Sequence, residues 1–289
     1  MRIAFIGFGE AGRAFADSLR AEGNHDLSAF DRKDTGEMAE AMAARGVRQG
    51  GGPGEALEGA EWIVSAVTAD QSLEAAEAAA PHLAEGQVFF DINSVSPDRK
   101  RATAAVVEAG GARYIDMAVM APVHPKGHAT PVLIAGGAAD ELAPALTEAG
   151  FALDVVGPGP GAATAVKMVR SLFVKGLEAI TVEALLAASA SGCFERVLAS
   201  LSKSYPGLGW PDNAHYNFER TLKHGARRAA EMRESAATLD ALGLNGALAA
   251  EVATVQDRMG ALDWDDLPDG DLERAVAALA RARTGQPPQ

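Results

Sequence analysis

Three glycines near the N-terminus have a spacing that could bind a dinucleotide. They follow the apolar run Ile3-Ala4-Phe5-Ile6, precede a predicted helix, and belong to the G-x-G-x-x-G segment Gly7, Phe8, Gly9, Glu10, Ala11 and Gly12. In such a segment the first glycine allows a tight turn, the second exposes backbone to a pyrophosphate, and the third lets helix and strand pack closely. The pyrophosphate would lie on the N–H groups that begin the helix. We expect all six residues to bind the cofactor; a structural glycine-rich turn is the alternative.

The residues at the end of the next predicted strand, 27–31, bear on which dinucleotide is bound. Asp31 lies about 20 residues after the glycines, where a carboxylate binds the ribose hydroxyls of NAD and repels a 2′-phosphate. Arg32 and Lys33 could instead pair with the 2′-phosphate of NADP. We predict NAD, with NADP as the alternative.

A lysine and a serine stand one turn apart on a predicted helix that follows Gly161. Side chains four residues apart share a helix face, so Lys167 and Ser171 point the same way. A lysine in a cleft beside the nucleotide domain could exchange a proton with a substrate oxygen while hydride moves to or from the nicotinamide. The alternative is an exposed helix lysine.

Two loops are predicted at the edge of the sheet where ligands bind. Buried strands over 61–67 and 87–92 lead into Val67 and Thr68 and into Asn93 and Ser94. Ligands of open parallel sheets bind outside the carboxyl ends of the strands, so these four residues are candidates for contacts to the cofactor or substrate. Asn93 and Ser94 could equally be ordinary turn and capping residues. The glycine run 50–54 is predicted to be a surface loop, since no strand leads into it.

The pattern of elements predicts two domains. Strands alternate with helices up to about residue 160, which is typical of an α/β, Rossmann-type doubly wound sheet. Residues 161–289 show only helices, so an all-α C-terminal domain is expected. It begins with a long interdomain helix over 162–191, and further helices are predicted near 194–203, 214–242, 246–260 and 270–283.

Composition excludes several classes of protein. A net charge of −13 argues against nucleic-acid binding, which needs clustered cations. No segment has the length and apolarity of a membrane span. A single cysteine, Cys193, rules out an internal disulfide and a multi-cysteine metal site, and we predict no metal. With no signal peptide visible, we expect a cytoplasmic protein.

Three motifs together resemble the β-hydroxyacid dehydrogenases, which include 3-hydroxyisobutyrate dehydrogenase and are related to 6-phosphogluconate dehydrogenase. They are the glycine segment, the stretch from Asp116 to Val123, and the segment from Gly161 to Lys167. The resemblance implies that Lys167 is catalytic and that the helical domain forms a homodimer. It also implies that substrate is bound at Val119, Met120, Ala121 and Pro122.

The chain departs from that family at several positions. Ser171 stands where the family has asparagine, although a hydroxyl can still donate to a substrate oxygen. The usual Ser-Gly-Gly is replaced near Met120, and Gly225 and Ala226 stand where a Lys-Asp pair is typical. The chain therefore resembles an outlying branch with an uncharacterised type of C-terminal domain, and the substrate is open.

The helix over 214–242 has one apolar face, with Phe218 and Leu222, and one polar face. The polar face carries His224, Arg228 and Glu231. It could be a solvated face, or His224 and Arg228 could hold an anionic group of the substrate, since Arg suits the two oxygens of a carboxylate. His124 is a weaker candidate for lining the same cleft.

These observations predict an NAD(P)-dependent oxidoreductase. Hydride would pass between the nicotinamide and a small, carboxylated hydroxy compound, with Lys167 as proton relay and Ser171 as orienting donor. An imine reductase on the same scaffold is one alternative. A sensor that binds the dinucleotide without chemistry is another.

Overall fold

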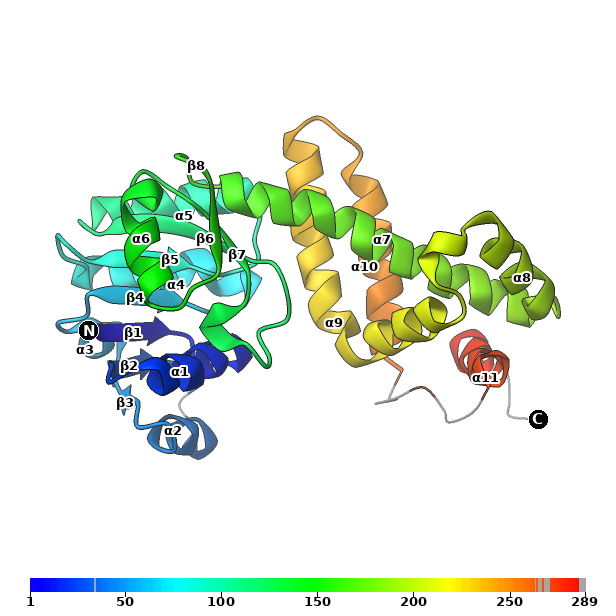
Figure 1. The fold of residues 1–289 in the computed structure, drawn as a ribbon, viewed down its shortest axis with the longest axis horizontal. Coiled ribbons are helices and arrows are strands. Elements are labelled where there is room, and N and C mark those ends of the chain that lie inside the picture. Colours follow the sequence, from blue (N-terminus) through cyan, green and yellow to red (C-terminus); the bar gives the residue numbers. More distant parts are fainter. Residues whose placement is uncertain (34, 263, 265–266, 268–270, 286–289) are drawn as a thin grey trace. The chain divides into compact units, whose positions relative to one another are not determined.

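A computed structural model describes residues 1–33, 35–262, 264, 267 and 271–285 of the chain. The fold divides into two compact units, Met1–Met168 and Val169–Gln289. Figure 1 shows the first unit built around a sheet and the second built from helices. Among the described residues, no helix is long and apolar enough to cross a membrane.

One eight-stranded sheet organises the first unit, in the order β3-β2-β1-β4-β5-β6-β7-β8. Its strands are β1 (Arg2–Ile6), β2 (Asp26–Phe30), β3 (Arg48–Gln49), β4 (Trp62–Ser65), β5 (Val88–Asp91), β6 (Arg113–Val119), β7 (Val132–Ala135) and β8 (Leu153–Gly157). Neighbouring strands are parallel except β6 and β7, which are antiparallel. The predicted doubly wound, mainly parallel sheet is thus confirmed.

Alternating side chains of the strands bury two different cores. In β1, Ile3 and Phe5 belong to one cluster with residues of α1, α2 and α6, whereas Ala4 and Ile6 belong to another with residues of α3, α4 and α5. These helices are α1 (Glu10–Glu22), α2 (Gly36–Ala43), α3 (Pro53–Leu57), α4 (Ser72–Ala79), α5 (Pro97–Ala109) and α6 (Ala139–Glu148). Burial on both faces explains why β1, β4 and β5 are continuous apolar runs.

The region around the glycine run 50–54 differs from the prediction. The short strand β3 leads directly into it, and Pro53 begins the helix α3. A Cβ at Gly50 would lie 2.7 Å from the backbone nitrogen of Ala56, so this run makes a close turn from strand to helix. The prediction of a loop without a preceding strand was wrong, because a strand of two residues has no visible hydrophobic period.

The second unit is helical, as predicted. The long helix α7 (Ala162–Ala190) starts in the first unit and continues in the second, where α8 (Phe194–Ser204), α9 (Asp212–Ala241), α10 (Gly246–Gly260) and α11 (Leu272–Thr284) follow. The predicted helix near 270–283 corresponds to α11, and residue 270 lies outside the described residues. Apolar side chains of α7, α9 and α10 form a common core that includes Ala179, Met232 and Val252.

Candidate active site

The three glycines differ in the space around them, as the dinucleotide motif requires. Gly7 has φ +89°, and a Cβ there would lie 2.4 Å from the carbonyl oxygen of Ala66. A Cβ at Gly12 would lie 2.8 Å from the carbonyl oxygen of Gly7, so the start of α1 packs closely on the turn. Gly9 has open space, since its Cβ would meet nothing within 4 Å. This cradle fits a pyrophosphate, because Gly9 also precedes α1 without a capping side chain.

Asp31 lies at the end of β2, directly beside the glycine turn. Its Oδ2 accepts a hydrogen bond from the backbone N–H of Phe8 at 2.7 Å, and its Oδ1 accepts one from Lys33 at 2.8 Å. Arg32 instead points its guanidinium at Glu74, with 3.0 Å between Nη1 and Oε1. Both members of that pair are exposed, so the pairing is weak and Arg32 can be recruited elsewhere.

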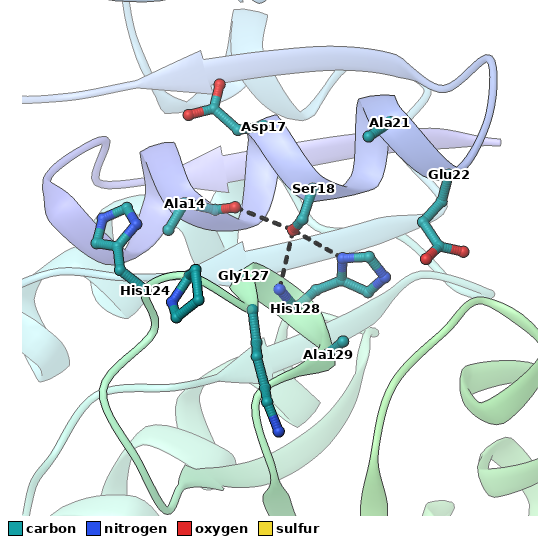
Figure 2. A pocket seen from close by; sticks show the side chains of 11 residues that line it. Ala14, Asp17, Ser18, Ala21, Glu22, His124, Gly127, His128 and Ala129 are labelled. Atoms are coloured by element: carbon teal, nitrogen blue, oxygen red, sulfur yellow. Dashed lines mark hydrogen bonds between the residues drawn. The ribbon is translucent and has the colours of Figure 1, made fainter.

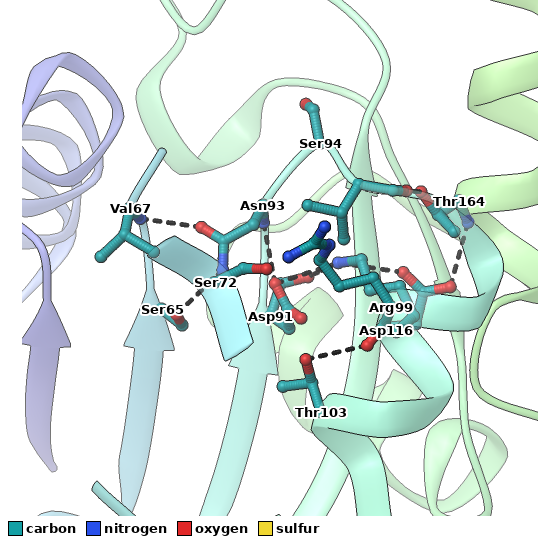
Figure 3. A network of polar contacts seen from close by, with 12 residues as sticks. Ser65, Val67, Ser72, Asp91, Asn93, Ser94, Arg99, Thr103, Asp116 and Thr164 are labelled. Atoms are coloured by element: carbon teal, nitrogen blue, oxygen red, sulfur yellow. Dashed lines mark hydrogen bonds and ion pairs between the residues drawn. The ribbon is translucent and has the colours of Figure 1, made fainter. Parts of the chain in front are cut away.

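Asn93 joins the carboxyl ends of β4 and β5. Its Oδ1 accepts from the backbone N–H of Val67 at 2.7 Å, and its Nδ2 donates to Ser65 Oγ at 2.9 Å (Figure 3). The side chain is buried, and thus it is no ordinary surface turn residue. In the loops after β4 and β5, Thr68 is exposed and Ser94 is half-buried.

Lys167 lies against the loop that carries Ser94. The lysine Nζ donates to Ser94 Oγ at 2.5 Å. Lys167 is half-buried on the second turn of α7, so it is not the exposed helix lysine of the alternative. The lysine and the loop after β5 therefore come together at the same edge of the sheet as the glycine turn.

A fully buried lysine, Lys100, forms ion pairs with two carboxylates at this edge. Its Nζ lies 3.1 Å from Asp91 Oδ1 and 3.3 Å from Asp116 Oδ1. The hydroxyl of Tyr114 donates to Asp91 Oδ2 at 2.8 Å. Burial raises the pKa of Tyr114 well above its usual range, and the negative charges of both carboxylates add to the shift.

The predicted substrate segment begins at Val119, the last residue of β6. Val119 is buried, the backbone N–H of Met120 donates to Pro131 at 2.9 Å, and Ala121 and Pro122 are exposed. Solvent can therefore reach Ala121 and Pro122 in this segment. His124 lies further along, in a hollow against α1 (Figure 2).

A second histidine in that hollow is buried and structural. His128 Nδ1 lies 2.7 Å from Ser18 Oγ (Figure 2). Its Nε2 lies 3.0 Å from the carbonyl oxygen of Ala149. Burial lowers the pKa of His128, while the nearby charge of Glu22 opposes this shift. These contacts fasten the loop after β6 to α1 and to the end of α6.

In the second unit, the polar face of α9 packs on α7. Arg228 forms a buried ion pair with Glu178, and Lys175 Nζ lies 2.6 Å from Glu231 Oε2. Ser171 is buried, with its Oγ 3.3 Å from Lys175 Nζ. The alternative of a solvated face is thus wrong for Arg228, because α7 supplies a buried carboxylate that the helical period of α9 alone does not reveal.

The absence of a lysine at position 225 has a packing reason. A Cβ at Gly225 would lie 2.3 Å from the carbonyl oxygen of Gln256 and 2.6 Å from the backbone nitrogen of Gly260. The helices α9 and α10 cross at this point with their backbones in contact. A lysine cannot occupy position 225 in this packing.

Sequence reasoning missed the buried charges Asp91, Lys100, Lys175 and Glu178. Lys100 belongs to the run Asp98-Arg99-Lys100-Arg101, which has the composition of a solvated helix face. Only the position of Asp91 at the end of a buried strand could have given a signal. In the part of the chain that the structure describes, no group of three or more metal-ligating side chains comes together.

The glycine turn, the strand-end acid and the parallel sheet define a dinucleotide-binding protein. A model of the NAD binding domain of 6-phosphogluconate dehydrogenase matches residues 2–157, and one of a domain of unknown function (DUF1932) matches residues 188–259. Because the first match covers more than half of the chain, the protein belongs to the family that has the NAD binding domain of 6-phosphogluconate dehydrogenase.

Solved structures agree with this assignment. The chain is 36% identical to a conserved hypothetical protein from Sinorhizobium meliloti 1021, with 98% of this chain and 96% of that chain covered and a TM-score of 0.79. It is 28% identical to a conserved protein of unknown function described as structurally similar to 3-hydroxyacid dehydrogenases, with 90% and 96% covered and a TM-score of 0.72.

A more distant relative shares the fold. The 3-hydroxyisobutyrate dehydrogenase of Mycobacterium tuberculosis, solved with L-serine, is 20% identical over 96% of this chain and 98% of that chain, with a TM-score of 0.75. The predicted resemblance to this superfamily is confirmed, including a C-terminal domain of uncharacterised type. A nicotinamide cofactor follows from the family.

Proposed function

We propose that the protein is an NAD(P)-dependent oxidoreductase acting on a small, carboxylated hydroxy compound, with Lys167 as proton relay. The observation that carries this proposal is the contact of 2.5 Å between Lys167 Nζ and Ser94 Oγ. It lies at the carboxyl ends of the parallel strands, where this class of sheet binds its ligands. The same edge carries the glycine turn.

The residues at this edge of the sheet have different roles in the proposed reaction. The backbone from Gly7 to Gly12 binds the pyrophosphate, and Asp31 binds the adenosine ribose. Val67, Thr68 and Asn93 border the nicotinamide, which when bound supplies the hydride acceptor or donor. Lys167 Nζ takes up the substrate hydroxyl proton during oxidation and returns it during reduction, while Ser94 orients the lysine.

In the first unit we propose the backbone of Val119–Pro122 as a substrate-binding segment. In the second unit we propose Ser171 as a donor to a substrate oxygen and His224 and Arg228 as residues that bind a carboxylate. The ion pair with Glu178 does not exhaust Arg228, since a guanidinium has five donors. How these side chains face the substrate stays a prediction.

We propose NAD as the preferred cofactor. Asp31 bears its carboxylate beside the glycine turn, where it suits the ribose hydroxyls of NAD and repels a 2′-phosphate. Fluorescence titrations with NADH and NADPH test this preference: tighter NADH binding is expected, and tighter NADPH binding would overturn the choice.

We also propose a homodimer in the cytoplasm, built through the second unit. Three apolar side chains on one face of α7 are exposed, namely Val169, Phe173 and Ile180, at 51%, 74% and 66%. Exposed apolar side chains that share one helix face suit a second copy of the chain.

A substrate panel tests the proposed activity. Purified protein is offered hydroxy acids with NAD and NADP, and carbonyl acids and cyclic imines with the reduced cofactors. Turnover of a hydroxy acid is the expected result. Turnover of imines alone would favour the imine reductase, and tight cofactor binding without any turnover would favour the sensor.

A further inference from the structure

The first turn of α7 is fastened to two other parts of the first unit (Figure 3). Asp116 Oδ2 accepts hydrogen bonds from the backbone N–H groups of Gly161 at 3.1 Å and Thr164 at 3.0 Å. A carboxylate from β6 therefore caps this helix, where the helix dipole favours negative charge. Thr164 Oγ1 donates to the carbonyl oxygen of Val95 at 2.6 Å.

The buried ammonium of Lys100 stabilises this attachment of α7 to β6. It lies between Asp116 and Asp91, and its Nζ also donates to the carbonyl oxygen of Asp91 at 2.6 Å. Two buried carboxylates repel each other unless a cation lies between them. Lys100 therefore fixes the position from which the carboxylate of Asp116 binds the start of α7.

The loop after β5 contacts α7 on two successive turns of the helix. Thr164 donates a hydrogen bond to Val95. Lys167, three residues later, donates one to Ser94. Residues three apart on a helix are neighbours on its surface, so a shift of Thr164 moves Lys167 as well.

We propose that Thr164 is a positioning residue for Lys167, held in turn by Asp116 and Lys100. The inference rests on the proposed function, because the place of Lys167 affects turnover only if this lysine moves a proton. Thr164 would set the distance between the ammonium and the loop after β5 without touching substrate. A displacement of about 1 Å in such a group can cost about 100-fold in rate.

The hydroxyl of Thr164 is the best target for a test. Thr164→Val removes one hydrogen bond and keeps the shape, whereas Thr164→Ser keeps the hydroxyl. Thr221→Val is a matched control, since Thr221 is a fully buried helix threonine of the second unit whose Oγ1 donates to Asn217 at 3.0 Å. Lys100→Met would leave two buried carboxylates unpaired and would test folding more than position.

The first readout needs neither substrate nor cofactor. The full-length protein is labelled with acetic anhydride, and the rate of Lys167 acetylation is followed by mass spectrometry. We expect Thr164→Val to label roughly fivefold faster, the factor that corresponds to one lost hydrogen bond. Thr164→Ser and Thr221→Val should label at the wild-type rate. Equal rates for wild type and Thr164→Val would overturn the inference.

The second readout separates this inference from the proposed function. With a turned-over substrate, Thr164→Val should lower kcat about 10- to 100-fold, shift its pH profile and leave the Kd of NADH unchanged. An unchanged kcat and pH profile would overturn the positioning role. If the wild type turns over no substrate while the labelling rates still differ as expected, the proposed function is contradicted. The structural effect of Thr164 on Lys167 is then still supported.

Discussion

Gly7 and Gly9 belong to one motif but would respond differently to a methyl group. At Gly7 the backbone has φ +89°, and a Cβ would collide with Ala66, so Gly7→Ala should destabilise the fold by at least about 2 kcal/mol. At Gly9 φ is −75° and the space is open, so Gly9→Ala should keep stability within about 0.5 kcal/mol.

Cofactor binding should show the opposite pattern to stability. The Cβ of Gly9→Ala would occupy the space where the pyrophosphate approaches, raising the Kd of NADH about tenfold or more. Urea unfolding and NADH titration on both variants measure the two effects. A Gly9→Ala protein with wild-type affinity would show that the pyrophosphate binds elsewhere.

The buried ion pair of Arg228 gives a prediction about stability. Arg228→Ala leaves Glu178 buried without its partner and should cost about 3–5 kcal/mol of unfolding free energy. The double variant Arg228→Met with Glu178→Gln should recover most of this loss, since no lone charge remains. Chemical denaturation of the three proteins checks it, and a loss below about 1 kcal/mol for Arg228→Ala would contradict the buried pair.

At the residue scale, the sequence revealed the site wherever local chemistry was enough. The spacing of Gly7, Gly9 and Gly12 predicted three distinct backbone environments, and all three were found. Lys100 and Glu178 could not be predicted, because a charged residue in a helix is normally solvated and its buried partner comes from a distant part of the chain.

At the element scale, the contact of α1 with the loop after β6 should depend on pH. Burial lowers the pKa of His128 below its ordinary value of 6.5, so the folded state resists a proton that the unfolded chain accepts. The stability from neutral His128 is fully present above pH 6.5. It is lost as the pH falls from there toward the folded-state pKa.

The variant His128→Gln isolates this contribution, because all other groups titrate in both proteins. The difference in unfolding free energy between wild type and variant should be constant above about pH 7. Below pH 6.5 the wild type should lose stability relative to the variant. Thermal or urea unfolding between pH 5 and 8 measures it. A difference that is flat over this range would contradict the burial effect.

The elements themselves were predictable where hydrophobic period or strand burial was strong. Strands β1, β4 and β5 and the long helix α7 were found close to their predicted limits. The two-residue strand β3 and the antiparallel direction of β7 were missed, because pairing direction and very short strands are decided by tertiary contacts.

At the scale of the whole molecule, the exposed face of α7 predicts a dimer. Phe173→Glu places a charge on this face and should weaken self-association by at least about 30-fold, since burying a phenylalanine contributes about 2–3 kcal/mol. Sedimentation equilibrium measures it, with Tyr205→Glu as an exposed aromatic control. A monomeric wild type, or a Phe173→Glu protein that still dimerises fully, would contradict the prediction.

The two units carry different kinds of information about function. The first unit has its cofactor chemistry in contiguous motifs, so the family and the nicotinamide cofactor followed from the residues. The second unit holds Ser171, His224 and Arg228, and its polar contacts join helices that are far apart in sequence. In the proposed function this second set contacts the substrate, and helical periodicity alone does not predict how its side chains are arranged in space.

In the proposed function Lys167 relays a proton while other residues bind the cofactor. The most direct measurement compares wild type and Lys167→Ala for kcat with the preferred substrate and for the Kd of NADH. We predict that kcat falls by about 10²–10⁴-fold while the Kd stays at its wild-type value. A Lys167→Ala protein that keeps wild-type kcat would contradict the proposed mechanism.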